Sequence, residues 1–257
     1  MEQQFTKRQY STSQVSLLTR SMLIASIAFI ILGACSYGWS VLFVNSLNYD
    51  DIGVGLGIFF ATLISGMVVS ILWVKNMFQS HSIGLTLLCY ALYILTTSLA
   101  FGWLFSLAAH DMALWWLPVI FVIAGGTFLL ALLFAKIISF NSVLTMGKVI
   151  GATALAMAIF LIIFLVLTIV FAVKPTEGTA MAADTIGSLI MLGMALVSFL
   201  YVIIDIWQIS KMSEFAAETG QEESKILPWF FGYRLLTDLV NVLFIVLMVV
   251  MKLLKYF

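Results

Sequence analysis

Seven long apolar runs, separated by short polar breaks, constrain the fold of this 257-residue chain more than any other feature. Each run holds the roughly 20 residues that a helix needs to cross a hydrocarbon layer about 30 Å thick. Helices are the expected form because lipid offers backbone groups no hydrogen-bonding partner. The predicted transmembrane helices cover about residues 21–45, 54–74, 83–107, 113–135, 149–173, 185–209 and 231–251.

Composition agrees with this interpretation. Hydrophobic residues make up 63% of the chain and charged residues only 9%, which excludes a soluble globular domain of this length. We therefore expect an all-α integral membrane protein in contact with the lipid bilayer and not with nucleic acid. A single seven-helix domain over residues 21–257 would follow a tail at 1–20 and would carry a polar loop at about 211–228.

The distribution of lysine and arginine predicts the orientation in the membrane, because cytoplasmic loops carry an excess of these residues. Seven spans place alternate loops on opposite sides. The larger group shares the side of the N-terminus: Lys7, Arg8, Arg20, Lys75, Lys136, Lys148, Lys211, Lys225 and Arg234. The smaller group comprises Lys174, Lys252 and Lys255. We therefore expect a cytoplasmic N-terminus, tail and 211–228 loop, with the C-terminus outside.

Two membrane chemistries lack their required residues. A retinal protein needs a lysine in the middle of the last helix, whereas Lys252 and Lys255 lie at its far end, where lysine side chains extend to the interface. An intramembrane protease needs a nucleophile or metal motif, and the chain has neither His-Glu-x-x-His nor Gly-x-Ser-x-Gly. We therefore expect no enzyme, no catalytic residue and no cofactor.

Two aspartates inside predicted spans are the main functional candidates, because ionisable side chains are costly in hydrocarbon. Asp205 lies near the cytoplasmic end of the sixth run and Asp238 near that of the seventh. At 1.5 Å per helical residue, Asp205 is about 9 Å inside Lys211, and Asp238 is about 6 Å inside Arg234. Their similar depths predict that adjacent antiparallel helices place them side by side.

Two carboxylates in contact at low dielectric cannot both ionise cheaply, so they should titrate as one unit and act as a pH sensor. Gln208 and Asn241, each three residues after an aspartate, and Thr237 would add polar groups. These oxygens are too few for a tight calcium site, which takes six to eight, but they suit transient calcium binding in an ion pathway. Alternatively, Arg234 neutralises the carboxylates and only pins the two helices together.

The same two segments resemble the Bax inhibitor family, the transmembrane Bax inhibitor motif proteins with bacterial YccA-like members. Tyr201 to Ile209 is similar to the Tyr-x-x-x-Asp-x-x-x-Ile pattern of the family's sixth helix. Leu235 to Leu243 is similar to the Leu-x-x-Asp-x-x-Asn-x-Leu pattern of its seventh helix. The seven-span layout extends the resemblance over essentially the whole chain.

The resemblance implies a central seventh helix wrapped by two layers of three helices, in a bacterial plasma membrane. It also implies a pH-responsive calcium leak in which Asp205 and Asp238 form the di-aspartyl sensor. A basic residue near the cytoplasmic end of the family's second helix can latch one aspartate, and Lys75 is the candidate here. Family members also regulate other membrane proteins, such as a membrane-bound protease, so a non-conducting regulator remains the alternative.

Overall fold

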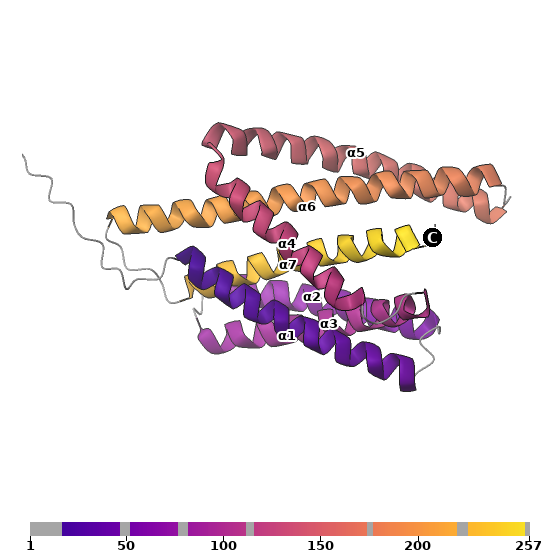
Figure 1. The fold of residues 1–257 in the computed structure, drawn as a ribbon, viewed down its shortest axis with the longest axis horizontal. Coiled ribbons are helices and arrows are strands. Elements are labelled where there is room, and N and C mark those ends of the chain that lie inside the picture. The colour runs from indigo at the N-terminus through magenta and orange to yellow at the C-terminus, as the bar shows by residue number, and fades with distance from the viewer. Residues whose placement is uncertain are drawn as a thin grey trace, which may run out of the picture.

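The computed structural model describes residues 17–46, 52–76, 82–111, 116–173, 177–219 and 226–254, which form seven α-helices (Figure 1). The helices are α1 (Leu17–Ser46), α2 (Ile52–Lys75), α3 (Ile83–Asp111), α4 (Trp116–Ile137), α5 (Phe140–Val173), α6 (Glu177–Thr219) and α7 (Leu227–Leu254). All seven are long and apolar enough to cross a membrane. The predicted all-α, seven-helix membrane fold is therefore confirmed.

Helix α7 lies between two groups of helices (Figure 1). On one side α3 packs against α1 and α2, and on the other α6 packs against α4 and α5. Helix α7 contacts α1, α3, α4 and α6, and the Trp73 ring of α2 stacks on Phe230 of α7. In the membrane-spanning window of α7, 44% of residues are buried, against 6% in that of α5. The last helix is therefore central, with α5 facing lipid.

Helices α5 and α6 extend furthest beyond the predicted apolar runs, because hydropathy marks the hydrocarbon layer and not the helix ends. Helix α5 begins at Phe140 instead of 149, where the Ser139 hydroxyl accepts a 3.4 Å hydrogen bond from the Ser142 amide and caps the first turn. Helix α6 begins at Glu177 and continues to Thr219.

The polar connection expected at 211–228 is therefore shorter, since part of it belongs to α6. Lys211 and Glu214 lie one turn apart there and form an exposed ion pair at 2.5 Å, which supports a solvated helix end. Helix α1 begins at Leu17, which is fully buried. The last residues of the expected 1–20 tail are thus its first turn, and residues 1–16 lie outside the described part of the chain.

Small residues bring α1 and α3 into close contact. A Cβ atom at Gly102 of α3 would lie 2.3 Å from the Cβ of Trp39 and 3.1 Å from the backbone oxygen of Ser36. Ser36 and Ser98 are fully buried, and their hydroxyls donate to carbonyl groups of their own helices. Close backbone approach through small residues is the usual way for membrane helices to associate, and it binds the α1–α3 group tightly.

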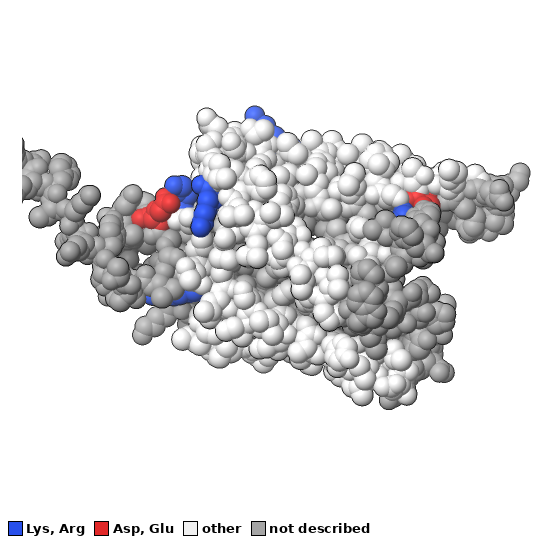
Figure 2. Space-filling model, in the orientation of Figure 1, with Lys and Arg blue, Asp and Glu red and all other residues white. Residues whose placement is uncertain are grey.

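Charged side chains gather at the two ends of the bundle and leave the middle free of them on the visible face (Figure 2). The chain passes back and forth between the ends (Figure 1), so most described basic residues belong to one end: Arg20, Lys75, Lys136, Lys148, Lys211 and Arg234. Lys252 belongs to the other end. The remaining basic residues of the two groups, Lys7, Arg8, Lys174, Lys225 and Lys255, lie outside the described residues.

Candidate functional site

Asp205 is the least exposed acidic side chain in the described part of the bundle. It follows Val202, Ile203 and Ile204 on α6, all of which are buried. Only 3% of its side chain is exposed, whereas acidic residues are almost never fully buried without a partner. Its position therefore requires compensating groups on neighbouring helices.

Helix α7 supplies the first of these groups, Arg234. Its Nε atom donates a hydrogen bond to Oδ2 of Asp205 and forms an ion pair with it. The arginine side chain is 40% exposed, so the surrounding helices enclose it only in part. Arg234 thus neutralises Asp205, and it pins α6 to α7 as the alternative interpretation of the sequence required.

The second group is Asp238, one turn after Arg234 on α7. Its carboxyl group lies within hydrogen-bonding reach of that of Asp205. The structure therefore brings the two aspartates together. Oδ1 of Asp205 and Oδ2 of Asp238 are both buried and accept no hydrogen bond from any described residue.

We call Asp205, Arg234 and Asp238 the aspartate cluster. It holds two acidic groups and one basic group, so full ionisation would leave one uncompensated negative charge in a largely apolar site. A single proton shared by the two carboxyl groups would satisfy both unpartnered oxygens and balance the charge. The arrangement can therefore exchange a proton, or accept a cation in its place.

The other polar residues predicted to support the site do not bond to the carboxylates. Gln208 is half-buried and Asn241 is exposed, and neither forms a hydrogen bond with an aspartate within the described residues. The Thr237 hydroxyl donates to the backbone oxygen of Tyr233 at 3.0 Å. Lys75 is exposed at the end of α2, and no ion pair joins it to a described acidic residue. The basic partner of the site is Arg234.

An aromatic cluster from α2, α3 and α7 lies beside the site, and the sequence analysis missed it. The Trp73 ring stacks on that of Tyr233 with centroids 4.3 Å apart, and Tyr90 and Tyr93 contact Tyr233 edge-on at 5.6 and 5.2 Å. Tyr90 donates a 2.8 Å hydrogen bond to the backbone oxygen of Trp229. These rings hold the first turns of α7 against the α1–α3 group.

Tyr93 also connects the site to α3. Its hydroxyl lies within hydrogen-bonding reach of Thr97 and Thr237 and close to Asp238. A signal was present in the sequence, since Tyr93 and Thr97 stand one turn apart within an apolar run and such pairs share a helix face. Nothing in the sequence specified that α3 would present this face to α7.

A resident metal ion finds few ligands here. Among the described residues no group of three or more His, Cys, Asp or Glu side chains could hold a metal. The two carboxylates offer at most four oxygens, one of which is bonded to Arg234. Calcium takes six to eight oxygens, so a calcium ion at this position would keep much of its water shell.

A second ion pair joins the same two helices at the opposite end of the bundle. Lys252 of α7 lies 3.0 Å from Oδ1 of Asp184 on α6 and also donates to the backbone oxygen of Asp184 and to the Ser188 hydroxyl. We call these three residues the lysine clasp. From Ser188 to Asp205, about 25 Å along α6, the sequence has no acidic, basic or histidine residue.

The acidic and basic groups of α6 that pair with α7 are thus at the two ends of the contact, Asp184 at one and Asp205 at the other. Comparison of the chain with protein-family models, curated proteins and solved structures found no match.

Proposed function

We propose that this protein is a pH-sensitive calcium leak channel whose gate is the pair formed by Asp205 and Asp238. One observation carries the proposal: two intramembrane carboxyl groups on adjacent helices share one arginine and each keep a buried, unpartnered oxygen. Ionisable groups placed at such cost within a membrane commonly mark ion or proton pathways.

The proposed gate works through the number of protons that the pair holds. With one shared proton, the carboxyl groups bond to each other and hold α6 against α7. Loss of that proton places two negative charges in contact, with Arg234 bonded to only one of them. The resulting repulsion favours separation of the helices and attracts a divalent cation into the gap. Proton binding and calcium passage are then competing events at one site.

We further propose that the protein belongs to the Bax inhibitor family and resides in a bacterial plasma membrane. The central α7 between two three-helix groups and the placement of the two aspartates support this assignment. The six described basic residues at one end of the bundle, against Lys252 at the other, support a cytoplasmic N-terminus.

The test is calcium flux into liposomes that contain the purified protein, measured over a range of pH. We expect a pH-dependent flux whose midpoint moves, or whose pH dependence disappears, in Asp205→Asn and Asp238→Asn. Asp184→Asn is the matched control, because it removes a carboxylate from the same helix but from the lysine clasp. It should keep the wild-type pH profile. Unchanged profiles in both cluster variants would contradict the proposed gate.

The second candidate is a non-conducting regulator of another membrane protein, such as a membrane-bound protease. The observation in its favour is the stretch of about 25 Å between the two ends of the α6–α7 contact, where the sequence of α6 has no acidic, basic or histidine side chain that could ease ion passage. A folded wild-type protein that passes no calcium at any pH would favour this candidate. Affinity capture of membrane partners would then be the next experiment.

A further inference from the structure

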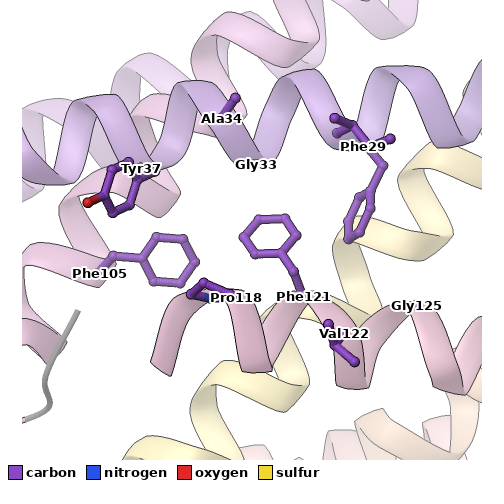
Figure 3. A pocket seen from close by; sticks show the side chains of 10 residues that line it. Phe29, Gly33, Ala34, Tyr37, Phe105, Pro118, Phe121, Val122 and Gly125 are labelled. Atoms are coloured by element: carbon purple, nitrogen blue, oxygen red, sulfur yellow. The ribbon is translucent and has the colours of Figure 1, made fainter. Parts of the chain in front are cut away.

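A cavity of about 540 Å³ opens between α1 and α4 (Figure 3). Its walls come from both helices and from Phe105 of α3. Because α1 and α4 belong to opposite groups around α7, the cavity lies in the seam between the two layers. It is separate from the aspartate cluster, which lies between α6 and α7 and shares no residue with it.

Packed aromatic rings close one side of the cavity, and another side is open. The Phe121 ring of α4 packs against Phe29 at 5.1 Å and Phe105 at 6.2 Å. A Cβ atom at Gly33 would lie 2.9 Å from this ring, whereas a Cβ at Gly125 would meet nothing within 4 Å. The space therefore persists because glycine stands at 125, and a larger side chain there would enter it without striking a neighbour.

The occupant must be apolar. Nine of the ten lining residues have apolar side chains or none, and Tyr37 alone brings a polar group. A buried water needs two to four hydrogen-bonding partners, which these walls do not supply. An unfilled space of this size would forfeit the dispersion contacts of its whole lining. Its volume lies within the range of sites that hold small organic ligands.

The residues around the opening of the cavity indicate where its apolar occupant comes from. The cavity falls within the spans Leu17–Asn45 and Pro118–Ile137, so its opening faces membrane hydrocarbon. Ile30 and Val122 at its edge are 69% and 73% exposed and are continuous with the lipid-facing surface. The half-exposed Tyr37 suits the polar end of a lipid, because tyrosine combines an apolar ring with a hydroxyl group.

We infer that the cavity is a binding site for one acyl chain of a bilayer phospholipid, inserted between the two layers beside α7. A chain held there acts as a wedge between α1 and α4 and stays longer than the lipids that coat the outer surface. The inference needs only the membrane location of the helices and does not depend on any ion flux or on the aspartate cluster.

Photo-crosslinking tests the site directly. The full-length protein is reconstituted in vesicles of phosphatidylethanolamine and phosphatidylglycerol with a small fraction of a phosphatidylcholine that carries a diazirine on its acyl chain. After illumination, peptide mass spectrometry maps the adducts. We expect adducts at Phe121 and Val122 to exceed several-fold those at Leu155 and Ile162, which are exposed on α5.

Two substitutions fill the cavity from opposite walls, Gly125→Leu on α4 and Ala34→Leu on α1. Each should remove most adducts at Phe121 and leave those on α5 unchanged. Gly147→Leu on α5 is the matched control, because a Cβ there also meets nothing within 4 Å but lies outside the cavity. It should leave all adducts unchanged. Thermal unfolding in detergent verifies that each variant folds.

Two outcomes would overturn the site. If Phe121 of the wild type carries no more adducts than Leu155, the cavity holds only the lipid that coats the rest of the surface. This comparison needs no variant. Lipid adducts absent from Phe121 in a protein that native mass spectrometry shows to be a dimer would mean that a second copy fills the space.

Discussion

Helices α6 and α7 are joined by an ion pair at each end, and the two pairs differ in what surrounds them. In the aspartate cluster, Asp205 is 3% exposed and its partner Arg234 is 40% exposed. In the lysine clasp, Lys252 is 24% exposed and Asp184 is 55% exposed. The buried member of the first pair is the acid, and the more buried member of the second is the base.

Charge balance separates the two pairs further. The lysine clasp matches one acid with one base, and the lysine also donates to a backbone oxygen and to Ser188. The aspartate cluster has a second acid, Asp238, with no second base beside it in the described structure. A balanced and partly solvated pair has little to gain from a proton. An unbalanced and buried pair has more to gain from a proton, and for this reason we propose the aspartate cluster, and not the lysine clasp, as the pH-sensitive site.

The largest effect should come from Arg234→Met, which removes the one base of the aspartate cluster. Breaking a buried ion pair by deleting one partner costs about 3–5 kcal/mol, because the other charge stays buried. We expect a loss of unfolding free energy of that order at neutral pH, measured by reversible denaturation in detergent micelles. The loss should shrink at acidic pH, since a protonated Asp205 needs no counter-ion.

The double variant Asp205→Asn with Arg234→Met provides the control. It removes both charges of the ion pair and leaves the net charge of the fully ionised cluster at one negative charge, as in the wild type, so its stability should return to within about 1 kcal/mol of the wild type. A double variant as unstable as Arg234→Met would mean that the arginine acts through packing and not through its charge.

A smaller effect of opposite sign should follow from Asp238→Asn. The substitution removes the excess acid, and the new amide can donate to the unpartnered oxygen of Asp205. We expect a gain of about 1 kcal/mol at neutral pH, the usual net contribution of one hydrogen bond. Asp184→Asn is the matched variant in the lysine clasp, and it should lower the stability instead. A loss of stability in Asp238→Asn would show that the second carboxylate is structurally required.

The fold was largely predictable because each of the seven spans carries its own signal in length and hydropathy. The ends of α5 and α6 were not, since Ser139 and the pair of Lys211 and Glu214 extend helices into polar sequence. Hydropathy measures contact with lipid, and a helix that leaves the membrane can continue in water.

The site was predictable in part for a related reason. Asp205 and Asp238 stood out because acids in apolar runs are rare, and their depths placed them level. Tyr93 and Trp73 did not, because an aromatic residue in a membrane helix can face lipid or protein equally well. The choice of Arg234 over Lys75 as the basic partner depends on side-chain placement. Arg234 is one turn from Asp238 and points to α6, whereas Lys75 is exposed at the end of α2.

A weaker effect should follow from Lys252→Met, the counterpart of Arg234→Met at the other end. Partly solvated ion pairs contribute about 0.2–1 kcal/mol, and Asp184 can turn to water when the lysine is lost. We expect a loss in that range that disappears in about 1 M salt, where the screening length falls to about 3 Å. The loss in Arg234→Met should persist in the same salt. If salt affects the two variants equally, the two ion pairs do not differ in how far water screens them.

The smallest effect should come from Ser188→Ala, which removes one of the acceptors of Lys252. The ammonium group keeps the carboxylate and the backbone oxygen of Asp184 at 3.0 Å each, and water can replace the lost hydroxyl because the site is open to solvent. We expect a loss below about 0.5 kcal/mol, less than the usual 0.5–1.5 kcal/mol for a hydrogen bond. A loss above 1 kcal/mol would mean that the lysine clasp is shielded from water, and the two ends of the α6–α7 contact would then differ in charge balance alone.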